Sequence, residues 1–286
     1  MVSKVRVPGE CSIEILQGII DERHRYVDFY RRIRGDLIRQ AEIFIESNGN
    51  PLMISPLDLK NYTDSEEEAK QRKKSLIGLY SPDNDKLPYQ QLEAMRKYNG
   101  LVVCPSCGEP GRPRTLDHYL PKDVFPELSA LLLNLTPMCD WCQGEKLTEY
   151  VTKDGRKRYI HPYFDDVDRP LFSLKLMPPY ATPSIEIIIY EDIPEDLARL
   201  VWLHLEGVGF LARFKEYFRT RYISLLRKAK VCRLEDSNNL RRCLELFLEM
   251  EVEKSVNSWD AVLYRSILED SELLNYLENG HLPDNL

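Results

Sequence analysis

Apolar side chains recur at helical spacing over most of the first hundred residues. Between residues 12 and 48 they return every three or four positions, and the Asn-Gly-Asn-Pro sequence at the end of this stretch is a strong stop signal. Further helical patterns follow at about 66–80 and around 92–98. The pattern predicts an N-terminal helical region over residues 1–99.

The C-terminal half first changes its period and then returns to the helical one. Two short apolar runs, 171–177 and 185–191, lie on either side of a proline-rich segment and are typical of strands. From Pro194 the helical spacing resumes. Helices are predicted at about 211–230, 237–254 and 258–278. We therefore expect a short β or loop connection at 166–193, a helical region at 194–286, and a mainly α chain that is α+β overall.

Between the helical regions lie two Cys-x-x-Cys pairs, Cys104/Cys107 and Cys139/Cys142, separated by 31 residues. Four thiolates complete a tetrahedral zinc site and leave no open position for a substrate, so the pairs predict a structural Zn²⁺. The alternative is four buried free cysteines, but two matched Cys-x-x-Cys pairs argue against it. A structural zinc does not need an insert of this length, so the residues inside it are of interest.

The insert carries Asp117-His118 and, further along, Asn134 within an apolar run. An imidazole with a pKa near neutral is suited to take a proton from water, and a carboxylate is a hard ligand for a divalent cation. Such a cation would neutralise charge on a phosphodiester. Alone, an Asp-His pair has little specificity, and Asn134 is equally typical of a turn or a cap. Their place between the cysteine pairs favours a catalytic site.

Composition limits the class of protein. The chain has 286 residues, with 43% hydrophobic and 30% charged residues, as in ordinary soluble globular proteins. Its net charge of −7 argues against a protein whose whole surface coats nucleic acid. Residues 96–164 are the segment with a positive balance, with 10 basic and 8 acidic side chains. No apolar run is long enough to cross a membrane and no signal-peptide pattern begins the chain, so we expect a cytoplasmic protein without membrane contact.

Basic residues suggest where phosphate groups could be held. Lys122, Lys146 and the run Arg156-Lys157-Arg158 are candidate phosphate contacts, although the run is equally typical of a solvated loop. The predicted helix at 211–230 interleaves basic and aromatic residues. It is either a nucleic-acid face or an amphipathic helix with inward aromatics and solvated bases, and the second interpretation is favoured.

Taken together, the motifs of residues 100–165 resemble the HNH endonuclease family. The subset with zinc knuckles is the nearest in pattern, and the chain also looks like HNH effectors of bacterial anti-phage defence systems. The resemblance covers less than a quarter of the chain. It is carried by Cys104-Pro-Ser-Cys107, Leu116-Asp117-His118-Tyr-Leu-Pro-Lys122, Phe125-Pro-Glu127, Asn134-Leu-Thr-Pro137 and Cys139-Asp-Trp-Cys142-Gln143-Gly-Glu-Lys146.

The resemblance implies a fold and a set of roles. The fold is a ββα-metal unit, inserted here between helical regions, with its helix beginning near Asp140. His118 corresponds to the general base, Asp117 to a ligand of a catalytic Mg²⁺ or Mn²⁺, and Asn134 to the residue that orients the histidine.

One position departs from the family's pattern. The family has His or Asn as a metal ligand directly after the last knuckle cysteine, whereas this chain has Gln143. The Gln143 amide oxygen is a weaker candidate ligand on a longer arm, and His161 or the carboxylates of Asp165 and Asp166 are further candidates. We expect a catalytic ion held by Asp117, Gln143 and His161.

Two functions follow as hypotheses. The first is a metal-dependent endonuclease that hydrolyses DNA, with RNA as the second candidate substrate. It would be a regulated defence effector whose helical flanks dock a protein partner, with an ATPase as the candidate. The alternative, motivated by Gln143, is a zinc-stabilised nucleic-acid- or protein-binding module whose nuclease site is degenerate.

Overall fold

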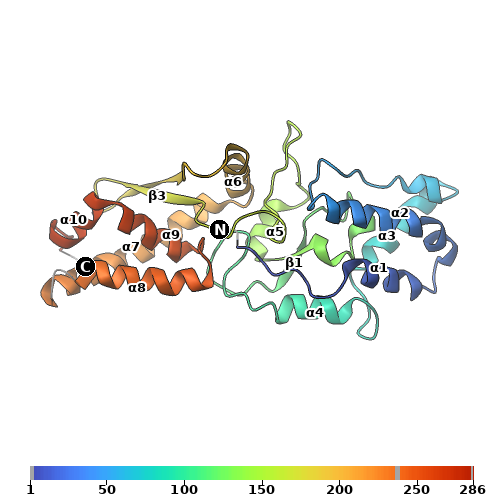
Figure 1. Cartoon of the computed structure of the whole chain (residues 1–286), viewed down its shortest axis with the longest axis horizontal. Helices are drawn as coiled ribbons and strands as arrows, with labels where there is room; N and C mark the ends of the chain where they lie inside the picture. Colours follow the sequence, from blue (N-terminus) through green and yellow to red (C-terminus); the bar gives the residue numbers. More distant parts are fainter. Residues whose placement is uncertain (1–2, 236–238, 285) are drawn as a thin grey trace. The chain divides into compact units, whose positions relative to one another are not determined.

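The computed structural model describes residues 3–235, 239–284 and 286, and it is mainly helical (Figure 1). The described helices are α1 (Ser12–Asp21), α2 (Val27–Glu46), α3 (Glu66–Gly78), α4 (Tyr89–Lys97), α5 (Asp140–Lys146), α6 (Glu195–Gly207), α7 (Phe210–Glu235), α8 (Asn239–Lys254), α9 (Trp259–Glu269) and α10 (Ser271–Asn279). Short 3₁₀ turns occur at Leu59–Tyr62, Pro126–Leu128 and Leu132–Asn134. The strands are β1 (Thr115–His118), β2 (Leu135–Met138), β3 (Phe172–Met177) and β4 (Ser184–Ile189). No helix in these described ranges is long and apolar enough to span a membrane.

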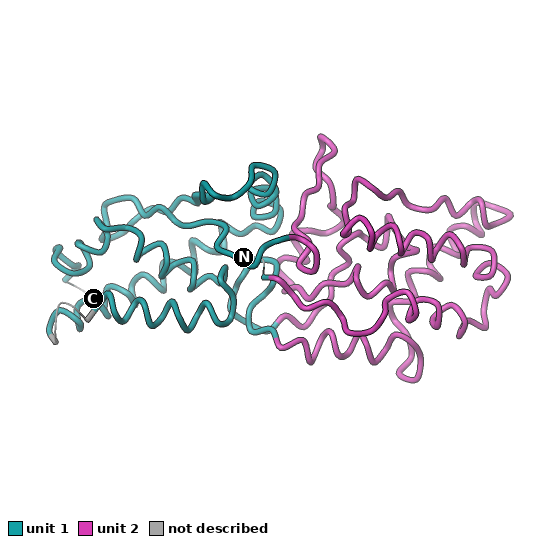
Figure 2. The backbone as a smooth tube through the Cα atoms, in the orientation of Figure 1, with its two compact units in different colours: residues 1–3, 101–112, 166–286 teal, residues 4–100, 113–165 magenta. Residues whose placement is uncertain are grey.

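The chain forms two compact units (Figure 2). The first unit, drawn in magenta and labelled unit 2 in Figure 2, consists of Lys4–Gly100 and Pro113–Asp165. The second unit, drawn in teal and labelled unit 1 in Figure 2, consists of Met1–Ser3, Leu101–Arg112 and Asp166–Leu286. The first holds α1–α5 with β1 and β2, and the second holds β3, β4 and α6–α10. The predicted division of the chain at residues 99, 165 and 193 concerns functional regions and not these compact units, so it stays a prediction.

Helices of the first unit form because their apolar positions share one face. In α2, Phe29, Ile33, Leu37 and Phe44 recur at intervals of about one or two turns, and each is at most 2% exposed. The N-terminus of α3 is capped by Ser65, whose hydroxyl accepts a hydrogen bond from the Glu68 backbone N–H at 3.1 Å. The three glutamates of its first turn also favour this end of the helix dipole.

The ββα part of the first unit is a short antiparallel pair followed by α5. In β1 and β2, Asp117 lies opposite Thr136, and His118 lies opposite Leu135. Leu116 and Leu135 pack with Leu92 of α4 in a buried cluster, against which the partly buried Tyr80 also packs. An isolated two-stranded pair is marginal in water, so packing against the flanking helices fixes the strands that carry the candidate site.

The second unit is built on a hairpin and an aromatic core. Burial alternates along β3, as expected for a sheet with one covered face, and β3 pairs antiparallel with β4. Phe210 and Phe214 of α7 stack with ring centroids 5.1 Å apart and meet the buried Trp259 of α9. The fully buried Asn257 accepts from the Leu171 N–H, and its amide group donates to backbone carbonyls before β3.

The predicted fold class is confirmed, because the described chain is mainly helical with two small two-stranded sheets and is α+β overall. The helical pattern at 12–48 is divided between α1 and α2, with Tyr26 at a φ of 60° before the second helix. The predicted start of a helix at 237 lies outside the described residues, and α8 is described from Asn239.

Candidate active site and metal centre

A pocket of about 480 Å³ opens beside the β1 strand of the first unit. Asp117 and His118 at the end of β1 line it, as does Gln143 of α5. Three cationic side chains also line this pocket: Arg96, Arg114 and Lys122. The structure therefore brings three of the predicted catalytic or ligating residues, Asp117, His118 and Gln143, into one pocket together with the predicted phosphate contact Lys122.

The His118 ring is held in a defined orientation. Its Nε2 lies 2.9 Å from the carbonyl oxygen of Ser129, and since a carbonyl only accepts, Nε2 carries the hydrogen. The Nδ1 atom then holds the lone pair. Burial lowers the pKa of His118 to about 4, against the opposing effect of the Ser129 carbonyl, so the ring is neutral at pH 7. A neutral imidazole with a fixed tautomer is the form that accepts a proton.

Asp117 is almost completely buried, and its carboxylate meets a buried ammonium. Oδ2 of Asp117 lies 2.9 Å from Nζ of Lys146, which also donates to the His118 carbonyl oxygen at 2.9 Å. Burial raises the pKa of Asp117, whereas Lys146 and a hydrogen bond from Gln143 oppose that rise. Lys146 is 1% exposed, so in this structure the predicted phosphate contact is committed to the carboxylate instead.

Asn134 is fully buried and acts on the backbone around the pocket. Its Oδ1 accepts from the Leu120 N–H at 2.7 Å, and its Nδ2 donates to the carbonyls of Leu120 and Leu128 at 3.0 and 3.1 Å. Leu120 follows His118 by two residues, and Leu128 precedes the Ser129 carbonyl that holds the ring. Asn134 therefore fixes both chain segments that orient His118, and it acts through the backbone.

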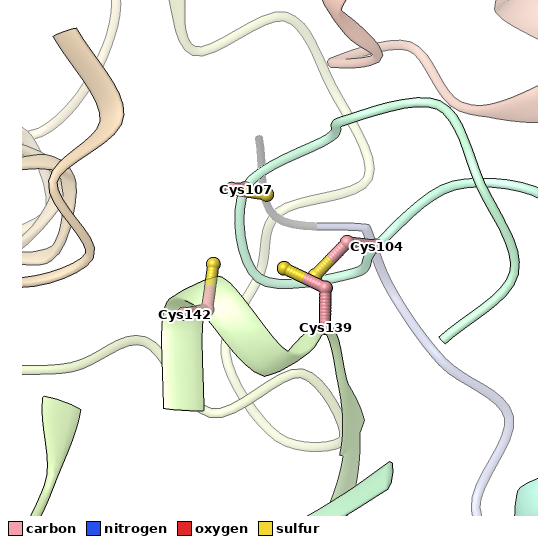
Figure 3. Close-up of side chains that lie close together, drawn as sticks. All are labelled: Cys104, Cys107, Cys139 and Cys142. Carbon is pink, nitrogen blue, oxygen red and sulfur yellow. The ribbon is translucent and has the colours of Figure 1, made fainter. Parts of the chain in front are cut away.

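The four predicted zinc ligands lie together (Figure 3). The sulfur atoms of Cys104, Cys107, Cys139 and Cys142 all lie within 4.8 Å of one another, and the side chains turn toward a common space. A tetrahedral zinc with Zn–S distances of about 2.3 Å requires sulfurs about 3.8 Å apart, so this cluster fits a metal ion. Gly108, at a φ of 78°, closes the first knuckle, with its N–H donating to the Cys104 carbonyl at 2.7 Å.

His161 lies away from this pocket. It is fully buried among aromatic rings, with its ring centroid 4.2 Å from that of Tyr119 and 4.5 Å from that of Phe164. Burial holds the pKa of His161 well below its usual range. The Asp165 carboxylate accepts from the His161 backbone N–H at 2.6 Å, and it also pairs with Lys157. These contacts hold the turn at His161, and His161 does not line the pocket that contains Asp117.

The predicted basic run is paired with acids. Arg156 lies 2.9 Å from Asp154, and Arg158 lies 2.8 Å from Glu149. None of Arg156, Lys157 and Arg158 lines the pocket. In α7, the aromatic side chains Phe214, Phe218 and Tyr222 are buried, whereas Lys215, Arg219, Arg227 and Lys230 are exposed. The arrangement in α7 is that of an amphipathic helix.

A divalent ion finds part of a ligand set in the pocket. Asp117 supplies one carboxylate and Gln143 one amide oxygen, and Asp123 is a second carboxylate on the pocket wall. Mg²⁺ is commonly held by one or two carboxylates together with water and substrate phosphate, so these residues fit such an ion. Among the described residues, the four cysteines form the one group of three or more His, Cys, Asp or Glu side chains close enough to hold a metal without other ligands.

Sequence reasoning missed Tyr80, Arg96 and Arg114 as members of the pocket. Arg114 lies one residue before β1, so its position in the motif was an available signal. Tyr80 lies in the turn after α3 and Arg96 lies in α4, and no local pattern connects them to His118.

Two known proteins are similar to part of this chain. A stretch of 73 residues is 37% identical to protein ea31 of Escherichia phage lambda, covering 24% of this chain and 25% of that protein. A stretch of 92 residues is 33% identical to the Septu protein PtuB of Bacillus thuringiensis, covering 31% of this chain and 33% of that protein. The matched stretches thus span about a quarter and a third of these relatives. No family model and no solved structure matches the chain. The chain is distantly similar to PtuB and carries a four-cysteine cluster that fits a metal.

Proposed function

We propose that this chain is a metal-dependent endonuclease of the HNH type, with DNA as its substrate and RNA as the second candidate. The observation that carries the proposal is the pocket beside β1, where a neutral His118 with a fixed tautomer lies next to Asp117 and cationic side chains. In this proposal, residues 100–165 form the nuclease unit, and the four cysteines bind a structural zinc.

The chemistry is hydrolysis of a phosphodiester. Nδ1 of His118 accepts a proton from a water molecule, the water oxygen forms a bond to phosphorus, and the ester P–O bond breaks. The leaving oxygen ends as a hydroxyl group after it takes up a proton. Asn134 keeps the imidazole in place through the backbone at Leu120 and Leu128. Lys122 contributes positive charge to the pocket wall.

A divalent ion would be held by Asp117 and Gln143, with water and substrate phosphate as its other ligands. When bound, it supplies neutralisation of charge on the phosphate and on the leaving oxygen. His161 is not part of this ligand set, because it does not line the pocket.

A plasmid-nicking assay with Mg²⁺ or Mn²⁺ tests the proposal, with a labelled RNA as a second substrate and any required partner present. Loss of a general base typically lowers a rate by about 10²- to 10⁴-fold, which is the expected effect of His118→Ala. His281→Ala changes an exposed histidine outside the pocket and serves as the matched control. Equal inactivity of wild type and His118→Ala on both substrates would mean that the chain is not a nuclease.

The buried ion pair favours a second candidate, a binding module with a degenerate nuclease site. Lys146 already neutralises Asp117, which leaves less negative charge to attract a cation. Calorimetric titration with Mn²⁺ distinguishes the two candidates. An endonuclease is expected to bind one Mn²⁺ in addition to its zinc and to lose it on Asp117→Ala, whereas a degenerate site would take up no Mn²⁺ in either protein.

We place this activity in a regulated effector of anti-phage defence. The motif resemblance suggests that setting, and the stretch shared with the Septu protein PtuB supports it. A protein partner, with an ATPase as the candidate, would dock on the helical flanks. Exposed apolar side chains on α8, including Phe247 and Met250, are compatible with such docking. Phage plating tests the setting: the intact gene should reduce plaque numbers, and both His118→Ala and Met250→Asp should restore them.

A further inference from the structure

Tyr80 connects α3 to the residues that carry the proposed chemistry. Its ring lies edge-on to the His118 ring, with centroids 4.6 Å apart and an interplanar angle of 67°. Its hydroxyl donates to the Leu116 carbonyl of β1 at 3.2 Å, and Gln143 donates to the same oxygen at 3.3 Å. The ring is therefore anchored to the strand on which Asp117 and His118 lie.

The end of α3 acts on His118 from a second direction. The Ser129 hydroxyl donates to the Leu76 carbonyl at 2.5 Å, while the Ser129 carbonyl accepts from Nε2 of His118. Leu76 is fully buried, so this anchor is shielded from solvent. The imidazole of His118 is thus restricted by two contacts. The Tyr80 ring packs against it, and the Ser129 carbonyl, which is anchored to Leu76, accepts its N–H.

Two cations lie against the same tyrosine. The Arg96 guanidinium carbon and the Lys122 ammonium nitrogen are each 5.3 Å from the Tyr80 ring centroid. A cation near an aromatic ring is held by the quadrupole of the ring without losing its charge. The Arg96 ion pair with Glu93 is loose, at 3.6 Å, and Glu93 also pairs with Lys97. Guanidinium groups have five N–H donors, so Arg96 keeps donors for a ligand.

The balance of charge indicates what the cations bind. Arg96, Arg114 and Lys122 line the same pocket of about 480 Å³ as Asp117 and Asp123, and the Asp117 carboxylate is already paired with Lys146. An excess of positive charge in a pocket of a chain with a net charge of −7 is complementary to an anion. Because His118 and the two cations already contact the Tyr80 ring, that ring is poorly placed to stack on a base.

We infer that Tyr80 is a positioning residue for His118, and that Arg96 and Lys122 beside it form a cradle for a backbone phosphate of the nucleic acid. This cradle rests on the proposed function, because it identifies where the substrate of that site is held. Arg96 and Tyr80 lie outside residues 100–165, so α4 and the turn after α3 contribute to the proposed nuclease site.

Substitutions on α4 offer a matched test of the cradle. Arg96→Gln and Lys97→Gln each remove one positive charge from a partner of Glu93, but Lys97 does not line the pocket. Binding of a fluorescein-labelled DNA duplex is measured by anisotropy in the His118→Ala background, across a series of salt concentrations. Arg96→Gln should weaken binding about tenfold and lower the slope of log Kd against log salt by about one, whereas Lys97→Gln should change neither. Equal effects of the two substitutions would overturn the cradle.

Substitutions of the tyrosine test its positioning role. Tyr80→Phe keeps the ring, whereas Tyr80→Leu removes it. In steady-state cleavage with Mg²⁺, at a temperature where all variants are folded by circular dichroism, Tyr80→Leu should lower kcat at least tenfold and should also raise KM, because the ring holds Arg96 and Lys122 as well as His118. Tyr80→Phe should retain most of kcat, and Arg96→Gln should mainly raise KM. Wild-type kcat in Tyr80→Leu would overturn the positioning role.

Failure of the inference and failure of the proposed function give different results. If wild type cuts and Arg96→Gln behaves like Lys97→Gln, the nuclease stands and the cradle is wrong. If no protein cuts, but Arg96→Gln selectively weakens DNA binding, the cradle is supported and the nuclease proposal is wrong.

Discussion

Glu127 is a carboxyl group with 1% of its surface exposed. Its Oε1 accepts from the Leu57 backbone N–H at 3.0 Å and lies 3.4 Å from Nε2 of Gln40. Burial raises the pKa of Glu127 to about 7, because its effect on the pKa is larger than the opposing effect of these hydrogen bonds. The titratable neighbour Tyr62 donates its own hydroxyl to Asp36 at 2.7 Å. Glu127 is therefore a group that stays protonated in the fold at pH values where a free glutamate is ionised.

This shift predicts a loss of stability on the alkaline side. Since the folded pKa lies above the unfolded one, the stabilisation is fully present below about pH 4.5 and is lost as the pH rises through 7, by an amount on the order of 3 kcal/mol. The Glu127→Gln variant should therefore show a smaller change in the free energy of unfolding between pH 5 and pH 8, and it should be more stable than wild type at pH 8. Urea denaturation at the two pH values measures this, with the exposed Asp123→Asn as control. A variant with the pH dependence of wild type would contradict the prediction.

Individual site residues could be predicted only where they share a local motif. Asp117 and His118 are adjacent in the sequence, and Gln143 follows a knuckle cysteine, so short local patterns predict all three of these pocket residues. Tyr80 and Arg96 reach the pocket through the packing of α3 and α4, which no spacing in the sequence encodes. The burial of Lys146 against Asp117 was hidden for the same reason, because a lysine is normally expected at the surface.

At the scale of elements, α5 is a seven-residue helix that ends in an unusual conformation. Leu147 follows it with φ 47° and ψ −120°, a region that favours glycine, and its side chain is 70% exposed. So short a helix has little stability of its own, and its place depends on buried contacts such as those of Cys142 and Lys146. A non-glycine residue in this conformation costs on the order of 1–3 kcal/mol.

Leu147→Gly is therefore expected to leave the free energy of unfolding unchanged or to raise it by about 1 kcal/mol, because relief of strain exceeds the entropy cost of glycine. Leu246→Gly is the matched control: this leucine is 42% exposed in the middle of α8, where glycine should cost about 1 kcal/mol. Urea denaturation of both variants gives the comparison. Equal destabilisation by the two substitutions would show that Leu147 is not strained.

The elements themselves were largely predictable, and their exceptions have physical causes. Periodic apolar positions predicted α2, which buries one face, and the helical stretch at 258–278, which the structure divides into α9 and α10. The start of α3 was predicted from its polar capping residues and charged first turn, since Leu76 is the one residue of that helix that is buried. The interruption between α1 and α2 was hidden because it contains neither glycine nor proline, and Tyr26 adopts the left-handed region instead. Strand β2 contains Pro137, a residue that argues against a central strand but is accepted at an edge of a two-stranded pair.

At the scale of the whole molecule, seven cysteines divide into a cluster and three separate side chains. Cys104, Cys107 and Cys142 are buried and Cys139 is partly buried, whereas Cys11 is exposed. As thiolates around a metal, the four sulfurs can stabilise the irregular segment of the first knuckle and the short helix α5, which carries Cys142. The predicted zinc would therefore be a condition for folding of the segments that carry the knuckles.

Removal of the metal should then cost far more than loss of one buried side chain. Structural zinc contributes an apparent ~10–16 kcal/mol in small zinc-binding peptides, which is comparable with the whole stability of an ordinary domain. We expect one zinc per chain by elemental analysis, none in Cys142→Ser, and a thermal midpoint lowered by more than about 10 °C in that variant and after treatment with a strong chelator. Cys11→Ser should keep both the zinc and the midpoint, because Cys11 lies outside the cluster. Full zinc content in Cys142→Ser, or an unchanged midpoint after zinc has been removed, would rule out a structural role for the four sulfurs.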